Sequence, residues 1–147
     1  GTELLTRLKD VLVEKRNDVA LPLTTSCSPG WIKFIEHTYP DFLKNVSTCK
    51  SPQQMFGALA KTYYTTKRKL DPSRVVSVSI MPCTAKKYQA DRPEMRSSGH
   101  KDVDYVLTTR ELARMIRQAG IDFGSLGEEK YDSIMGESTG AAVIFGA

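Results

Sequence analysis

The stretch TTSCSPGW, residues 24–31, places a cysteine between an apolar, β-branched run and residues that favour the start of a helix. Ser28 can accept a hydrogen bond as a helix N-cap, and Pro29 suits the first helical position. A second stretch, SIMPCTAKK at residues 79–87, repeats this order, with Cys83 following an apolar run. Open α/β sheets bind ligands where strands end and helices begin. Both cysteines therefore mark a candidate site at the carboxyl edge of a parallel sheet.

The rest of the chain alternates in the same way. Short apolar runs predict buried strands at residues 19–25, 75–81 and 103–107. Helical spacing and helix-start residues predict helices at 2–15, 28–37, 51–64 and 108–119, and a further strand end turning into a helix at 134–140. Gln54 and Glu111 lie where they would complete capping boxes. This alternation predicts an α/β fold with a mostly parallel sheet flanked by helices.

Composition limits the classes of function. The 147 residues are 40% hydrophobic and 26% charged with a net charge of +4, as in one ordinary globular domain or lobe. The densest basic run, residues 67–69, has no aromatic residues between its charges, so we expect no nucleic-acid partner. No apolar run reaches the roughly 20 residues of a membrane helix, so we expect no membrane partner. Both ends look like cuts from a longer protein.

The three cysteines are odd in number and far apart, and no CxxC motif is present. This argues against a zinc ribbon or a thioredoxin site and favours a reducing, cytoplasmic compartment. A thiolate is stabilised just ahead of a helix and can act as a nucleophile or as a soft metal ligand. His37 and His100 are poorly placed to serve as a base, which argues against the interpretation of either cysteine as a nucleophile. A small buried hydrophobe is the alternative for either strand-end cysteine, and we interpret Cys49 as structural.

Five stretches resemble, in order, the catalytic domain of the iron-only (FeFe) hydrogenases: TTSCSPGW, STCKSPQQ, IMPCTAKK, LTTRELARMI and MGESTGAAVIFGA. The resemblance covers nearly the whole chain. It implies that residues 1–147 are a single α/β lobe of that catalytic domain, truncated at both ends. It also implies the H-cluster, a 4Fe-4S cube joined by a thiolate to a di-iron centre that carries CO, cyanide and a dithiolate. The reaction would be the reversible oxidation of molecular hydrogen to protons and electrons.

The resemblance also implies roles for individual residues. Cys83 matches a cysteine ligand of the cube, Cys27 matches a proton-relaying thiol, and Lys86 matches the lysine that donates to a cyanide. Residues that match the lining of the di-iron pocket are Pro52, Gln53, Met81 and Phe145. Residues that match the proton path are Glu3 and Ser47, with Arg7 at its outer end. An anionic centre requires a cationic donor, which explains a lysine at this position.

Three features depart from the family pattern. Ser28 stands where the family usually has a second cysteine that ligates the cube, so either Cys27 becomes the ligand or Ser28 is a weaker one. Gln89 stands where the family has glutamate. A later Cys-Pro-Gly-Gly-Cys motif, with two more ligands, is absent. We therefore expect the isolated chain to be inactive and without cofactor. We expect it to work with the remainder of the catalytic domain and with ferredoxin or an NAD(P)-linked electron-transfer subunit.

Two alternatives stay open at this point. A non-catalytic iron–sulfur relative, either a sensor or a cluster-assembly protein, would also vary at the paired-cysteine position. Lys86, Gln53 and Pro52 favour the hydrogenase, because only a di-iron site needs them. The second alternative is an α/β interaction domain whose thiols are buried.

Overall fold

The computed structural model describes residues 1–130 and 132, so Phe145 and the predicted turn at 134–140 lie outside the described residues. The α-helices described are α1 (Thr2–Leu12), α2 (Pro29–Thr38), α3 (Pro52–Leu59), α4 (Thr65–Arg68), α5 (Ala85–Asp91) and α6 (Thr109–Gln118). A π-helical turn, η2 (Ala60–Tyr64), joins α3 to α4. The 3-10 turns are η1 (Pro40–Asn45), η3 (Pro72–Arg74) and η4 (Phe123–Ser125), and the strands are β1 (Val78–Met81) and β2 (Tyr105–Thr108).

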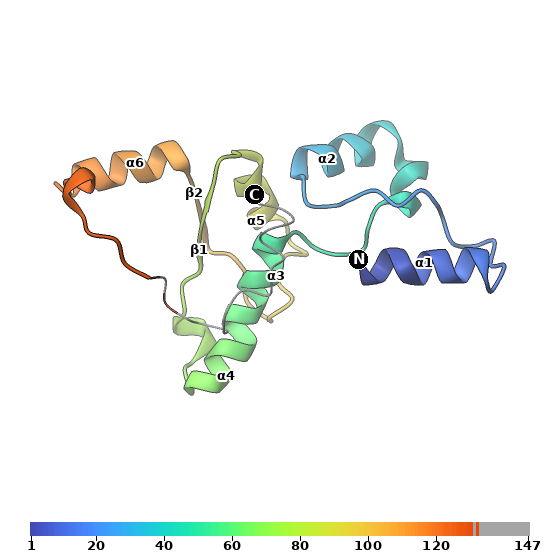
Figure 1. The fold of residues 1–147 in the computed structure, drawn as a ribbon, viewed down its shortest axis with the longest axis horizontal. Helices are drawn as coiled ribbons and strands as arrows, with labels where there is room; N and C mark the ends of the chain where they lie inside the picture. Colours follow the sequence, from blue (N-terminus) through green and yellow to red (C-terminus); the bar gives the residue numbers. More distant parts are fainter. Residues whose placement is uncertain (131, 133–147) are drawn as a thin grey trace.

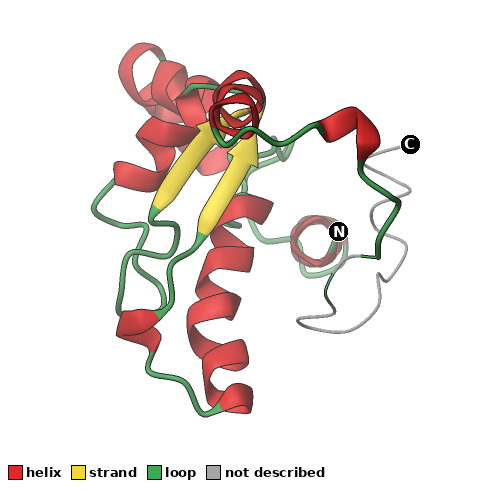
Figure 2. Cartoon of the chain, turned by 90° about the vertical axis from the view of Figure 1, so that its left-hand side faces the viewer, coloured by secondary structure: helices red, strands yellow, loops and turns green. Residues whose placement is uncertain are grey.

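The sheet consists of β1 and β2 in the described part of the chain. The strands run parallel, with Val78 opposite Tyr105 and Met81 opposite Thr108 (Figure 2). Helix α5 connects them, as a parallel pair requires, and its Ala90 packs with Val103 and Val106 in the buried core. The predicted α/β fold is thus confirmed.

The predicted strand at residues 19–25 is wrong. Among the described residues, Thr24 is the only member of this run that pairs, in an isolated parallel bridge with Val46. Its N–H donates to Asn45 O at 2.7 Å, and the Ser47 N–H donates to Thr24 O at 2.7 Å. Pro22 has no N–H to contribute to a ladder, so an apolar run around it does not extend into a strand.

Two of the predicted helix starts are confirmed in detail. The Ser28 side chain accepts a hydrogen bond from the Trp31 N–H at 3.5 Å, and Pro29 begins α2. Thr108 and Glu111 form a reciprocal capping box at the start of α6. These bonds involve residues three apart, so the local sequence is enough to define them.

The prediction for the third helix start is confirmed only in part. Helix α3 does begin at Pro52, but the Ser51 hydroxyl caps nothing and donates to Gln89 Oε1 at 2.8 Å. Gln54 is fully buried, and its side chain has no hydrogen-bond partner among the described residues. A partner on α5 therefore replaced the expected capping box.

The elements are spread along the molecule, with α1, α2 and η1 on one side of the sheet and α6 on the other (Figure 1). Helix α3 is anchored beside the sheet by close backbone packing. A Cβ atom at Gly57 would lie 2.3 Å from the Asp102 carbonyl oxygen, so this position requires glycine. Among the described helices, none is both long and apolar enough to cross a membrane.

Candidate functional site

Lys86 joins the two cysteine-bearing segments. Its Nζ donates to Cys27 O at 2.5 Å and to Gln89 Oε1 at 3.1 Å. Its backbone N–H donates to Cys83 O at 3.2 Å. Cys83 follows the end of β1 and Cys27 precedes α2, so Lys86 links the segment after β1 to the segment before α2, although no described strand leads to Cys27.

The electrostatics of this corner suit an anion. Burial lowers the pKa of the Lys86 ammonium, and the neighbouring Cys27 and Cys83 side chains oppose that shift. An ammonium has three N–H groups, and described residues use two of those on Lys86. No described residue accepts from the third N–H group, which is open to a ligand within that part of the chain. All three cysteines are free and exposed, which contradicts the alternative of an interaction domain with buried thiols.

Ser28 is the N-cap of α2. Its oxygen accepts the Trp31 N–H, and a hydroxyl is a harder donor than the thiolates that iron–sulfur cubes prefer.

Of the residues predicted to line a di-iron pocket, Gln53 contacts Lys86 directly. Gln53 is buried; its Oε1 accepts from Ser79 Oγ at 3.0 Å, and its Nε2 donates to Lys86 O at 3.4 Å. These bonds tie the start of α3 to β1 and α5. Pro52 is the first residue of α3, and Met81, at the end of β1, packs on the core.

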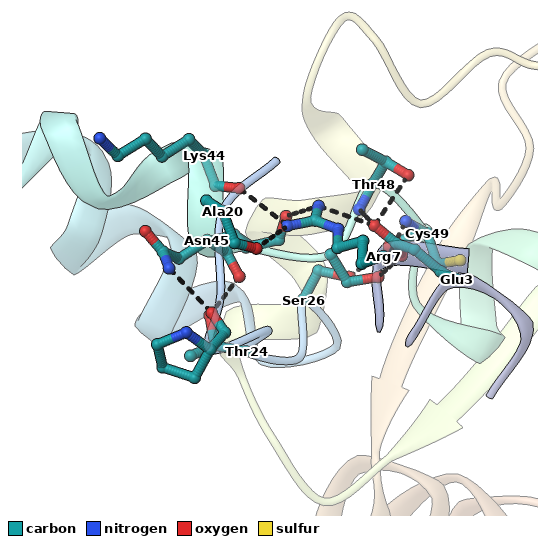
Figure 3. A network of polar contacts seen from close by, with 12 residues as sticks. Glu3, Arg7, Ala20, Thr24, Ser26, Lys44, Asn45, Thr48 and Cys49 are labelled. Atoms are coloured by element: carbon teal, nitrogen blue, oxygen red, sulfur yellow. Dashed lines mark hydrogen bonds and ion pairs between the residues drawn. The ribbon is translucent and has the colours of Figure 1, made fainter. Parts of the chain in front are cut away.

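A second polar network surrounds Glu3 on α1 (Figure 3). Its carboxylate accepts from Ser47 Oγ, from the Thr48 N–H at 3.1 Å and from Arg7 Nη2 at 2.8 Å. These bonds attach α1 to the connector before α3. They matter for this helix because it has no buried residue.

Arg7 extends the network with three carbonyl contacts. Its Nη1 donates to Ala20 O at 3.2 Å and Lys44 O at 2.9 Å, and its Nη2 donates to Val46 O at 3.1 Å. The three predicted proton-path residues, Glu3, Ser47 and Arg7, are thus brought together.

Glu3 is strongly acidic in this setting. Burial raises its pKa, but hydrogen bonds from Ser47, the Thr48 N–H and Arg7 outweigh burial and lower the pKa from 4.5 to about 2. At neutral pH the carboxylate is ionised, and Ser47 is the donor of their shared hydrogen bond. In this conformation the Glu3 carboxylate accepts hydrogen bonds from its neighbours and donates none.

A cavity of about 330 Å³ lies between the two networks. Its lining includes Ser26 and Ser47 on the side of the Glu3 network, and Ser51 and Gln89 on the side of Lys86. Sequence reasoning gave Ser26 and Ser51 no part in a site. The three-residue spacing of Lys86 and Gln89 on one helix was the available signal for their contact.

The donor set fits an iron–sulfur and di-iron group only in part. A 4Fe-4S cube takes four thiolate ligands. Within residues 1–130 and 132, no three His, Cys, Asp or Glu side chains are grouped to hold a metal ion. The described chain offers exposed thiols and a cationic donor, but not a complete ligand set.

The parallel strands β1 and β2, with α5 connecting them and Lys86 near the end of β1, define an α/β domain. Residues 1–147 match the family model described as iron only hydrogenase large subunit, C-terminal domain. The chain belongs to this family.

Three relatives show the range of similarity. The periplasmic [Fe] hydrogenase large subunit of Nitratidesulfovibrio vulgaris is 57% identical over 99% of this chain and 34% of its own length. An apo [FeFe]-hydrogenase variant from Chlamydomonas reinhardtii has a TM-score of 0.84 at 41% identity, over 96% of this chain and 34% of that one. The cytosolic iron-sulfur assembly component 3 of Pongo abelii is 40% identical over 78% of this chain and 25% of its own length. The chain spans about a third or less of these relatives.

Proposed function

We propose that this chain is one lobe of an iron-only hydrogenase that catalyses the reversible oxidation of molecular hydrogen. The observation that carries the proposal is the Lys86 ammonium near two exposed thiols. It donates to Cys27 O and Gln89, and no other described residue accepts from its third N–H group. Such a donor suits an anionic ligand that sits beside a thiolate-bound cluster.

The chain's residues take distinct parts in this proposal. The Cys83 thiolate is a ligand of the cube, with Ser28 at the position of a second ligand. Lys86 binds an anionic ligand, and Pro52, Gln53, Met81 and Phe145 line its pocket. Cys27, Ser47 and Glu3 carry the proton path. When bound, the H-cluster supplies the electron-transfer and hydrogen-splitting chemistry.

The remaining ligands come from the rest of the catalytic domain, because the described residues do not complete a ligand set. We therefore propose that the isolated chain holds no cofactor and is inactive. Electrons pass to ferredoxin or to an NAD(P)-linked subunit. A cytoplasmic location stays a prediction.

A non-catalytic iron–sulfur relative is the second candidate. It is favoured by the 40% identity to an iron-sulfur assembly component and by Ser28 in place of a ligand cysteine. Such a protein would keep the cube and lack the di-iron centre.

The test uses the full-length parent, matured and purified without oxygen. We expect hydrogen evolution together with infrared bands of CO and cyanide. Lys86→Asn should abolish most of these bands and leave the cube intact. Lys87→Asn is the matched control, because Lys87 pairs instead with Glu111 at 2.7 Å. A parent that carries the cube but shows no CO or cyanide bands would decide for the non-catalytic relative.

A further inference from the structure

The side-chain oxygen of Gln89 is shared by two donors from different elements. The Ser51 hydroxyl reaches it at 2.8 Å from the start of α3, and Lys86 Nζ reaches it at 3.1 Å from within α5. Gln89 is 4% exposed and Ser51 is fully buried. The bond from Ser51 is therefore shielded from water and the bond from Lys86 is partly shielded, which makes both stronger and more costly to lose.

The chemistry of the donors fixes the orientation of the amide. An ammonium can only donate, so the Gln89 oxygen must face Lys86, and its NH₂ group must face elsewhere. Ser51 donates to the same oxygen and so holds the amide in this orientation. The hydrogen bonds from Ser51 and from Lys86 to this oxygen together define one position for the Lys86 ammonium.

This acceptor carries no charge. Lys86 forms no ion pair with any carboxylate of the described residues, whereas the next residue, Lys87, pairs with Glu111 at 2.7 Å. A carboxylate at position 89 would hold the ammonium but would also offset its positive charge. An amide oxygen holds it and leaves that charge to act on a ligand.

We propose that Gln89, oriented by Ser51, is a positioning residue that holds the Lys86 ammonium against a small anionic ligand without neutralising it. The inference rests on the proposed function, in which that ligand is a cyanide of the di-iron centre.

The test compares Gln89→Leu, Gln89→Glu and Ser51→Ala in the full-length parent. In the metal-free parent, a ¹⁵N-lysine spectrum follows the hydrogen-bonded ammonium of Lys86. In the loaded parent, infrared spectroscopy follows the cyanide bands, and iron analysis follows the occupancy of the di-iron centre. Gln118→Glu, on the exposed surface of α6, adds the same charge away from the site as a control.

We expect Gln89→Leu to lose the protected ammonium signal and to lower di-iron occupancy several-fold. Gln89→Glu should restore the ammonium signal and keep occupancy within about twofold, but shift the cyanide bands. Ser51→Ala should broaden those bands, and Gln118→Glu should leave them unchanged. If Gln89→Leu disturbs folding, Gln89→Glu and Ser51→Ala test the positioning role of Gln89 in its place.

Unchanged cyanide bands in both Gln89→Glu and Ser51→Ala would overturn the inference. If Lys86→Asn still removes the bands in that case, the proposed function stands and only the positioning role is wrong. If Lys86→Asn also leaves the bands unchanged, the proposed function loses its anchor, and this inference is overturned with it.

Discussion

Glu3 illustrates how single residues hold this lobe together, because α1 buries no side chain and depends on polar contacts. Its carboxylate joins α1 to Ser47 and Thr48, more than forty positions further along the chain. A change in its charge should therefore loosen the whole helix.

The first prediction is that Glu3→Gln weakens the attachment of α1 in a pH-dependent way. The pKa of Glu3 is lowered from 4.5 to about 2, so the folded state gains stability from the carboxylate above pH 4.5 and loses it as the pH falls toward 2. Amide hydrogen exchange of α1 in the parent should be faster in the variant near neutral pH, and the difference should vanish near pH 2. Glu14→Gln, at an exposed ion pair with Lys9, is the control and should change little. An equal difference at every pH would contradict the prediction.

The second prediction separates the roles of Cys27 and Ser28 in the parent. Ser28→Cys should strengthen binding of the cube, because a thiolate is the softer ligand. It should also weaken the start of α2 by about 0.5–1 kcal/mol, because Ser28 caps the Trp31 N–H. Cys27→Ala should keep the cube and turn over poorly. Iron and sulfide analysis with hydrogen assays measures both, and loss of the cube in Cys27→Ala would make Cys27 the ligand.

At the scale of elements, the sheet and its site depend on how closely α3 approaches the segment before β2. Gly57 permits this approach, because its Cα lies against the backbone of Asp102 and the side chain of Val103. The same helix carries Gln53, and Ser51 lies just before it, so a shift of α3 would move the contacts to Lys86 and Gln89.

The third prediction is that Gly57→Ala destabilises the parent by about 1–3 kcal/mol, the usual range for overpacking. The added methyl would lie 2.3 Å from the Asp102 carbonyl oxygen, so the backbone must move. Gly30→Ala is the matched control: Gly30 is an exposed helical glycine with nothing within 4 Å of an added Cβ. That change should stabilise the protein by about 0.5–1 kcal/mol. Thermal unfolding of both variants measures the contrast, and equal effects would refute the packing argument.

The whole molecule exposes an apolar sheet face. Val78, Ile80 and Tyr105 lie on the strands and are 52%, 49% and 63% exposed. Strand residues that alternate in this way share one face of the sheet, so the exposed residues form a surface that another layer would normally cover. The relatives are about three times longer than this chain, and we expect the remainder of the domain to cover this face.

The fourth prediction concerns that face. Ile80→Thr with Tyr105→Thr should make the isolated chain bind less of a hydrophobic dye and aggregate less, because less apolar surface meets water. The same pair should destabilise the parent by about 3–6 kcal/mol, since each buried side chain contributes roughly 1.5–3 kcal/mol. Dye binding of the isolated chain and thermal unfolding of the parent test the two halves. A parent of unchanged stability would show that the face stays exposed there.

The sequence by itself determined the features that depend on neighbouring residues. The starts of α2 and α6 follow from caps three positions apart, and β1 and β2 follow from short apolar runs. The family also follows from the sequence, because its motifs are contiguous. Local hydrogen bonds and backbone preferences act over a few residues, so they can be read directly from the chain.

Only the tertiary structure decided which distant groups meet. Ser51 could cap α3, yet its hydroxyl donates to Gln89, 38 positions away. The run around Pro22 could form a strand, yet within the described part of the chain it pairs only through the bridge between Thr24 and Val46. Lys86 contacts both cysteine-bearing segments, because its Nζ donates to the carbonyl of Cys27, 59 positions away, and its N–H donates to the carbonyl of Cys83. These outcomes depend on burial and on competition among distant partners, which no local pattern encodes.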